Sequence, residues 1–279
     1  MDKLIWDLFE ETGNIKYYLL LKNMKQTKKW WFLKMEEVSG IVLSETNYSD
    51  TSKILNVLTK EYGLIGVMSK GSRNMKSKLR GVSRKLVQGR FHIYYKKNGL
   101  STLTGVDVIN SFNNILTDLT RVSYASYIID LILQVLKQNN DSSLYELVCA
   151  TLTKMDEGLP SAVLTSIIEI KLLDYLGVKP MIDGCAICGS VENIVSLSST
   201  HGGYICANCY QNEGIVSDKA IKLLRMFYYV DINSITKLDI KSDTLKEVNI
   251  FLDDYYDRYT GLYMKSKSFL KQLEKINQI

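Results

Sequence analysis

The chain has 279 residues, enough for two domains, and 46% of them are hydrophobic, which excludes an intrinsically disordered protein. No secretory h-region and no run of about 18 apolar residues is present, so the expected setting is the reducing cytoplasm and not a membrane. The formal charge of +5 is modest, and any electrostatic signal must come from the distribution of charges along the chain.

The first 34 residues differ from the rest of the chain. Trp6, Phe9 and Ile15 occur at spacings that suit one or two short helices, and the polar run Thr27-Lys28-Lys29 leads toward Met35, where a strand-led domain begins. We therefore predict that residues 1–34 are an appended N-terminal extension.

Short β-rich runs separated by turn residues dominate residues 35–112. Gly63 and Asn98-Gly99 mark breaks, and the second predicts a type I′ hairpin turn because both residues accept a positive φ. Five such strands fit a small closed barrel of the oligonucleotide/oligosaccharide-binding (OB) type. The predicted strands are Val38–Glu45, Ser52–Leu58, Leu64–Ser69, Val87–Tyr95 and Leu100–Val108.

A basic stretch lies inside this barrel region. From Tyr62 to Val106 there is no Asp or Glu but there are ten Lys or Arg residues, which leaves 25 basic and 30 acidic residues for the rest of the chain. Such an excess repels itself unless a polyanion neutralises it, and nucleic acid is the commonest such partner. The alternatives are an anionic membrane, an acidic protein partner or a merely solvated loop. The candidate DNA contacts are Lys70, Arg73, Lys76, Lys78, Arg80, Arg84, Lys85 and Arg90.

Aromatic residues near this stretch suggest base stacking. Phe91, Tyr94 and Tyr95 are the candidate rings, although an aromatic residue in a strand belongs to the core more often than to a binding face.

After Val108 the apolar residues recur at helical spacing. Pro160 suits a first helical turn, and Gly177 followed by Pro180 ends that helix. The predicted domain 113–279 is all-helical, with a cysteine module inserted at 183–212, so the fold class is α+β. The predicted helices are 115–138, 143–155, 160–176, 216–230 and 244–263.

Four cysteines form two tight pairs, Cys185-Ala-Ile-Cys188 and Cys206-Ala-Asn-Cys209, separated by residues 189–205. This spacing is typical of tetrahedral Zn²⁺, and four thiolates leave no open position for an activated water. We therefore predict one structural zinc ion per chain. His201 is a less favoured ligand, and the unpaired Cys149 is expected in the core.

Catalytic motifs are missing from the sequence. It contains no P-loop and no dinucleotide-binding fingerprint, and neither His92 nor His201 lies in a nucleophile-like context. A metal-dependent nuclease would need an open metal site and acidic residues near the basic surface. We therefore predict that the protein is not an enzyme.

Taken together, these motifs resemble the RecO family of bacterial DNA repair proteins over about residues 36–272. The family often has a proline after its basic loop, where this chain has Lys85-Leu86. The resemblance is carried by Val38-Ser39-Gly40-Ile41-Val42-Leu43, by Lys70-Gly71-Ser72-Arg73 and Ser77-Lys78-Leu79-Arg80, by Leu176-Gly177 before Pro180 and the first cysteine pair, and by Tyr263-Met264-Lys265-Ser266-Lys267-Ser268-Phe269-Leu270.

The resemblance implies a nucleoid-associated recombination mediator of the RecF pathway. Such a protein binds single- and double-stranded DNA, anneals complementary strands, contacts the single-strand-binding protein and, with RecR, helps load RecA without using ATP. It also implies that the eight basic residues contact DNA and that the four cysteines bind zinc. A different class of function stays open, namely a zinc-stabilised interaction scaffold whose basic face docks an acidic protein tail.

The N-terminal extension has a resemblance of its own. Leu4-Ile5-Trp6, Phe9, Thr12-Gly13-Asn14-Ile15 and Tyr18-Leu19-Leu20 are similar to the short YqzL-type proteins of Firmicutes. This resemblance implies a fusion with a small neighbouring reading frame, or a read-through of it.

Overall fold

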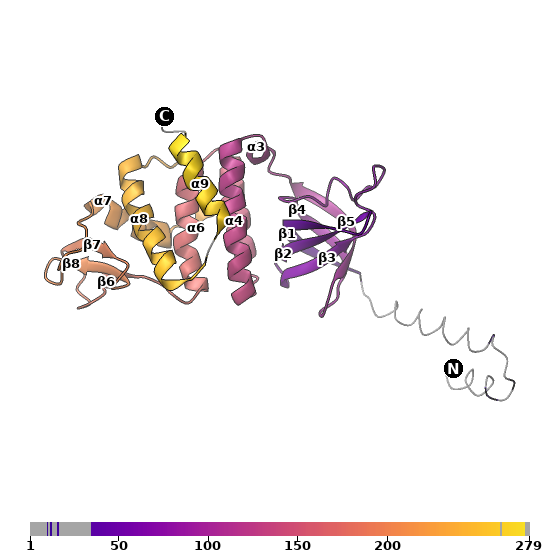
Figure 1. Ribbon diagram of the computed structural model, residues 1–279, viewed down its shortest axis with the longest axis horizontal. Coiled ribbons are helices and arrows are strands. Elements are labelled where there is room, and N and C mark those ends of the chain that lie inside the picture. Colours follow the sequence, from indigo (N-terminus) through magenta and orange to yellow (C-terminus); the bar gives the residue numbers. More distant parts are fainter. Residues whose placement is uncertain (1–9, 11, 13–15, 17–34, 263, 277–279) are drawn as a thin grey trace.

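The computed structural model describes residues 35–262 and 264–276, together with residues 10, 12 and 16 (Figure 1). A β-barrel lies at one end of the molecule, the helices form the middle, and the small β6–β8 sheet lies at the other end. The predicted extension 1–34 falls almost entirely outside the described residues.

Five strands close into a barrel in the order β1-β2-β3-β5-β4. This is the OB arrangement, and it confirms the predicted barrel. The interior is filled by alternate residues of the strands, among them Val57, Val67 and Phe91, which are fully buried. The strands are β1 Met35–Tyr48, β2 Ser52–Thr59, β3 Gly63–Ser69, β4 Gln88–Tyr94 and β5 Ser101–Asn110.

Two local features shape the barrel. The long strand β1 pairs with β4 through its first half and with β2 through its second, and a β-bulge between Val42 and Ser44 accompanies the change. The predicted type I′ turn at Asn98-Gly99 is wrong, because only Gly99 has a positive φ, of 125°. The β4–β5 connection is instead a longer loop over residues 95–100.

The helical body follows the barrel. The predicted helix 115–138 is divided in two because Asp118 caps α4, its side chain accepting a hydrogen bond from the amide of Arg121 at 3.0 Å. The helices are α3 Asn113–Leu116, α4 Leu119–Gln138, α5 Leu144–Asp156, α6 Ser161–Tyr175, α7 Asp218–Tyr229, α8 Ser242–Tyr259 and α9 Lys265–Ile276, with a 3₁₀ turn at Ile232–Ser234.

The C-terminal helix α9 was not predicted from the sequence. The helix expected at 244–263 ends at Tyr259, and Gly261 then adopts a φ of +61°, which turns the chain back onto the body. Leu270 of α9 is buried in the same core as the other helices. Lys265 and Lys267 therefore belong to a helix separate from α8.

The cysteine module contains a three-stranded sheet that the sequence did not indicate. Its strands are β6 Met181–Cys185, β7 Ile194–Ser198 and β8 Gly203–Cys206, in the order β6-β8-β7. Gly203 is required there, since a Cβ atom at this position would lie 2.1 Å from the carbonyl oxygen of Met181.

The barrel packs directly against the helical body. Ile41, Leu43 and Leu58 on the outside of the barrel are fully buried in the same hydrophobic cluster as the helices. The β2–β3 turn is held by Asn140, whose Oδ1 accepts a hydrogen bond from the amide of Leu64 at 2.6 Å. One surface of the barrel is therefore an internal interface.

Helix α4 is long and apolar enough to cross a bilayer by length and composition. Over half of its most apolar 18-residue window, 56%, is buried inside the protein. Core helices often show this pattern, because a helix that is apolar on most sides packs in the centre of a bundle.

Candidate nucleic-acid interface and metal centre

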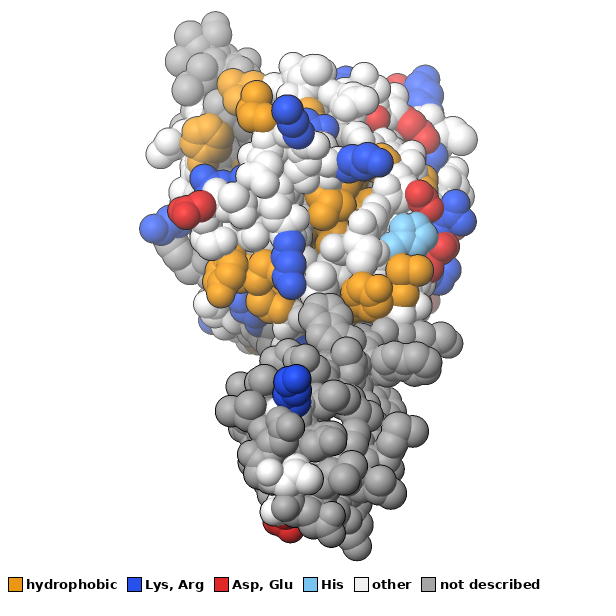
Figure 2. All heavy atoms as spheres, turned by 90° about the vertical axis from the view of Figure 1, so that its right-hand side faces the viewer, with side chains coloured by type: hydrophobic (Ala, Val, Ile, Leu, Met, Phe, Trp, Pro, Cys, Tyr) orange, Lys and Arg blue, Asp and Glu red, His pale blue; other side chains and the backbone are white. Residues whose placement is uncertain are grey.

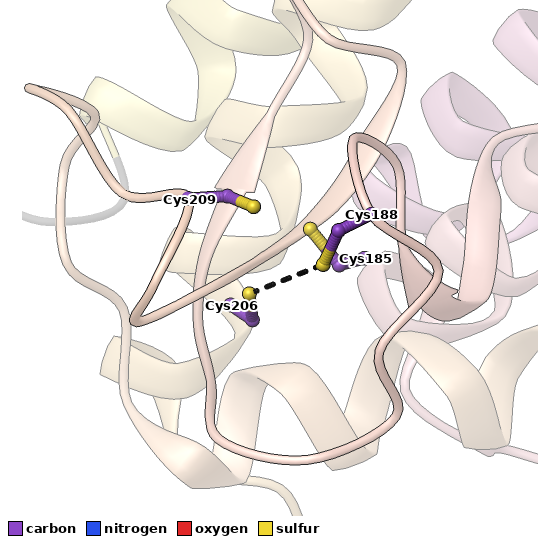
Figure 3. Close-up of side chains that lie close together, drawn as sticks. All are labelled: Cys185, Cys188, Cys206 and Cys209. Carbon is purple, nitrogen blue, oxygen red and sulfur yellow. Dashed lines mark hydrogen bonds between the residues drawn. The ribbon is translucent and has the colours of Figure 1, made fainter.

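The four paired cysteines converge on one point. Cys185 ends β6 and Cys206 ends β8, while Cys188 and Cys209 lie in the turns that follow (Figure 3). All four Sγ atoms lie within 4.8 Å of one another, and those of Cys188 and Cys206 are 3.6 Å apart. Thiolates about 2.3 Å from a tetrahedral zinc ion would be separated by about 3.8 Å. The cluster therefore has the size of a four-thiolate metal site.

The four thiol groups can all be ionised together only if a cation lies between them. Burial opposes ionisation of Cys185, but amides of Cys188, Cys206 and Ile187 outweigh it and lower the pKa of Cys185 to about 6. The pKa of Cys209 is raised to about 12, first by its hydrogen bond with Cys188 and then by burial. Four thiolates at this separation are mutually repulsive, so a metal ion is needed to hold all of them in the charged form.

Glycines let the backbone fold tightly around the sulfurs. A Cβ atom at Gly184 would lie 2.7 Å from the carbonyl oxygen of Gly189, and Gly189 itself has a φ of +75°. His201 is not part of the cluster. Its Nδ1 lies 3.1 Å from Oγ of Ser198 and 3.2 Å from Oε1 of Glu213. The candidate metal centre of the cysteine module is therefore formed by the four cysteines without His201.

Residues 70–85, here called the basic loop, connect β3 to the segment that leads into β4. The loop is a series of turns, in which amides of Asn74, Ser77 and Arg80 donate to carbonyls three residues earlier. Ser83 is fully buried, and its Oγ lies 2.7 Å from that of Ser69. The loop is thus held in a defined shape on the barrel.

Six of the eight predicted DNA contacts project from this loop into solvent. None of these six side chains forms an ion pair with an acidic residue in the described part of the chain. Figure 2 shows Lys and Arg side chains across the barrel end, with exposed hydrophobic groups between them and most acidic groups near one edge. The six are Lys70, Arg73, Lys76, Lys78, Arg80 and Arg84.

The remaining two predicted contacts have different surroundings. Lys85 is largely buried, which lowers its pKa, while the charge of Asp130 on α4 acts in the opposite direction. Arg90 lies on β4, where its Nη1 is 3.6 Å from Oε1 of Glu37. His92 is beside it, with Nε2 3.0 Å from Oδ2 of Asp107. These two cations face acidic groups of the protein itself.

The basic loop rejoins the barrel at Leu86, whose amide donates to the carbonyl of Val42 at 2.9 Å. This side chain is only 2% exposed and packs into the helical core, with a φ of +68° that is unusual for a branched residue. The Lys85-Leu86 step, where the RecO-like pattern often has proline, is therefore the point where the loop meets the helical body.

The candidate stacking rings lie in different places. Phe91 is fully buried in the barrel core. Tyr95 stacks on Tyr62, with ring centroids 4.0 Å apart, and Tyr94 is half-buried. Tyr48, which is not among the candidate rings, is 52% exposed at the end of β1.

The geometry can be compared with known proteins. Residues 34–112 match the family model described as "Recombination protein O N terminal", and residues 116–268 match "Recombination protein O C terminal". The chain belongs to the RecO family. RecO membership gives the protein a role in DNA repair and recombination, and the family matches begin where the N-terminal extension ends.

Relatives support the RecO assignment over most of the chain. A protein of Bacillus pumilus, named DNA repair protein RecO, is 36% identical over 244 residues, which covers 86% of this chain and 95% of the relative. Proteins of the same name from Listeria monocytogenes and Halalkalibacterium halodurans are each 34% identical, covering 86% of this chain and 96% of the relative.

Proposed function

We propose that this RecO-family protein is a non-enzymatic recombination mediator that binds single- and double-stranded DNA and anneals complementary strands. It would act with RecR to help load RecA onto DNA covered by the single-strand-binding protein. The observation that carries the proposal is the set of six exposed cations on the basic loop, none of which is neutralised within the described chain.

Phosphate contacts explain both binding and annealing. A loop of Lys and Arg side chains recognises the DNA backbone without reading its sequence, and DNA binding releases the counterions that surround the phosphates. Two complementary strands repel one another through their phosphates, so cations that neutralise part of that charge lower the barrier to pairing. No nucleotide hydrolysis is required for this step.

We propose that the cysteine cluster holds one structural Zn²⁺ per chain. Cys185, Cys188, Cys206 and Cys209 would supply all four ligands and leave no position for substrate or water. When bound, the ion would fix the module and neutralise the thiolates. The RecR, RecA and single-strand-binding partnerships, and the nucleoid location, rest on the family resemblance.

The experiment is annealing of two complementary fluorescent oligonucleotides without nucleotide. The test variant carries Arg73→Glu, Lys78→Glu and Arg80→Glu. The matched control carries Lys219→Glu, Lys222→Glu and Lys237→Glu, which change the net charge equally at exposed lysines of the helical body.

We expect the wild type and the control to accelerate annealing and the loop variant to lose most of that acceleration. Equal rates for loop variant and wild type would refute the role of the loop. If the wild type does not accelerate annealing but binds an acidic peptide through the same three cations, the interaction-scaffold function replaces this proposal.

A further inference from the structure

Three metal-ligating side chains from neighbouring strands meet on the barrel, separate from the cysteine cluster. They are Glu37 on β1, His92 on β4 and Asp107 on β5, and β4 lies between the other two strands. One donor atom from each side chain can be chosen so that all three lie within 4.8 Å of one another. Among the described residues, the cysteine cluster is the only other group of this kind. We name these three residues the barrel triad.

The strand register places the triad on the outer face of the barrel. Glu37 is directly opposite His92, and their neighbours Val38 and Phe91 are opposite each other. Val38 and Phe91 are buried in the barrel core, so Glu37 and His92 point outward, because successive residues of a strand point to opposite sides. Asp107 lies on the same face, since the residue before it in β5 is opposite Phe91.

An irregularity in β5 lies next to the histidine. The register between β4 and β5 shifts after His92, and the extra residue Thr104 donates from Oγ1 to the carbonyl of His92 at 2.8 Å. Gly105, which is opposite His92, has no side chain that could stand between the ring and Asp107. Bulges of this kind redirect side chains and recur beside functional sites. The backbone is therefore arranged so that Asp107 reaches the imidazole.

The donor atoms have separations close to those around a bound ion. Nε2 of His92 lies 3.0 Å from Oδ2 of Asp107, and Nδ1 lies 3.8 Å from Oε2 of Glu37. An ion with bonds of about 2.1 Å separates neighbouring donor atoms by about 3.0–3.4 Å. One ring nitrogen binds the ion, so one carboxylate has to rotate toward it, and the Glu37 and Asp107 side chains are 49% and 59% exposed. The rotation disturbs one exposed ion pair, between Glu37 and Arg90, and such pairs contribute little.

The donor set selects a class of ion. Imidazole nitrogen suits first-row transition ions such as Co²⁺, Ni²⁺ and Zn²⁺, which also accept carboxylate oxygens, whereas Mg²⁺ and Ca²⁺ prefer oxygen ligands throughout. Three protein ligands leave the remaining positions to water. An ion bound by the triad should therefore exchange more readily than one enclosed by four thiolates.

We propose that Glu37, His92 and Asp107 bind one divalent first-row transition ion, in addition to the ion of the cysteine cluster. The bound ion would link β1, β4 and β5 at the point where the bulge interrupts the β4–β5 ladder. It would also neutralise Glu37, the carboxylate that pairs with Arg90. The inference does not depend on the proposed DNA binding.

The test is a calorimetric titration of the full chain with Ni²⁺, after the cysteine cluster has been loaded with zinc. A parallel titration with Co²⁺ is followed by absorption, because cobalt bound to thiolates gives charge-transfer bands that nitrogen and oxygen ligands do not produce. The triad variants are Glu37→Gln, His92→Gln and Asp107→Asn. The matched control is His201→Gln, which removes the other histidine of the chain, whose Nδ1 also lies beside a carboxylate, 3.2 Å from Oε1 of Glu213.

We expect the wild type and His201→Gln to bind one further Ni²⁺ per chain, without thiolate bands in the Co²⁺ titration. Each triad variant should weaken this binding by at least about 10-fold, since even changes behind a metal ligand cost about 10- to 100-fold. An excess of Mg²⁺ should not displace Ni²⁺. Ni²⁺ should raise the melting temperature of the wild type and the control but not that of His92→Gln, because the ion binds the folded barrel.

Four results would overturn the inference. They are no Ni²⁺ binding beyond the zinc, a Ni²⁺ affinity that no triad variant lowers, an equal loss in His201→Gln, and thiolate bands that account for all of the added Co²⁺. Circular dichroism of each variant shows whether it is folded. The triad residues lie on three different strands, so a variant that fails to fold leaves two others to decide the result.

Discussion

Lys267 in the helical body and the cations of the basic loop on the barrel have opposite surroundings. In the body, Lys267 of α9 reaches between Glu169 and Asp253, with Nζ 3.1 Å and 2.6 Å from their carboxylate oxygens, and Tyr127 donates to the same Glu169. In the barrel, the six cations of the basic loop face solvent. Charges paired within the fold serve folding, while charges left unpaired are available to a partner, so variants in the two regions should fail differently.

The largest effect should come from the metal centre. Cys206 is 1% exposed and ends the middle strand of the module sheet, so Cys206→Ser should abolish metal binding and unfold the module. Structural zinc contributes on the order of 10 kcal/mol of apparent folding free energy in small zinc domains. Metal content by atomic emission and thermal unfolding with and without a chelator would measure both effects.

The matched control is Cys149→Ala, which removes a buried cysteine outside the cluster. It should retain one zinc per chain. A wild-type protein that contains no zinc even after reduction and reconstitution would remove the basis of the metal assignment.

The next largest effect should follow from Lys267. Burial alone would lower the pKa of Lys267, but Glu169 and Asp253 outweigh it and raise that pKa. Lys267→Met would leave Glu169 buried without its cation, which should cost about 3–5 kcal/mol of unfolding free energy. Chemical denaturation measures the loss, and Lys265→Met, an exposed lysine two residues earlier, is the control.

A compensating variant sharpens this prediction. Adding Glu169→Gln and Asp253→Asn to Lys267→Met removes the unpaired charges, so much of the lost stability should return. No recovery would mean that packing of α9, and not charge pairing, dominates the effect.

The sequence predicted those parts of the protein that depend on local pattern. Alternation of apolar residues located the five strands, and the spacing of Cys185, Cys188, Cys206 and Cys209 gave the cluster, because each short turn by itself places two sulfurs together. The type I′ turn prediction was wrong because Asn98 does not adopt the positive φ that this turn needs at both central residues.

Features that depend on contacts between distant segments could not be predicted. Lys85 and Arg90 are indistinguishable from the loop cations in sequence, and only the fold brings them to Asp130 and Glu37. The ion pairs of Lys267 likewise depend on the break between α8 and α9 at Gly261. The sequence did not predict this break, because the residues around Gly261 are compatible with a continuous helix.

In the barrel, the expected loss is of affinity and not of stability. Arg73→Glu, Lys78→Glu and Arg80→Glu together should leave the unfolding free energy within about 1 kcal/mol, since exposed surface changes cost little each. They should lower affinity for every DNA sequence to a similar degree. Anisotropy titrations on strands of different sequence, beside denaturation of the same preparations, separate the two quantities. If the triple loop variant loses as much unfolding free energy as Lys267→Met, the loop cations also stabilise the fold, and the contrast with the helical body does not hold.

The smallest expected effects concern Lys85 and Arg90, and they decide how far the phosphate-binding surface extends. Each phosphate contact on a single strand contributes about 0.7 to the slope of log affinity against log salt, so six contacts give a slope near 4 and eight a slope near 6. Because Glu37 already lies 3.6 Å from Arg90, Arg90→Gln should leave that slope unchanged, whereas Lys78→Gln should reduce it by about 0.7. If Arg90→Gln reduces the slope as much as Lys78→Gln, DNA displaces Glu37 from Arg90, and the binding surface continues from the basic loop onto β4.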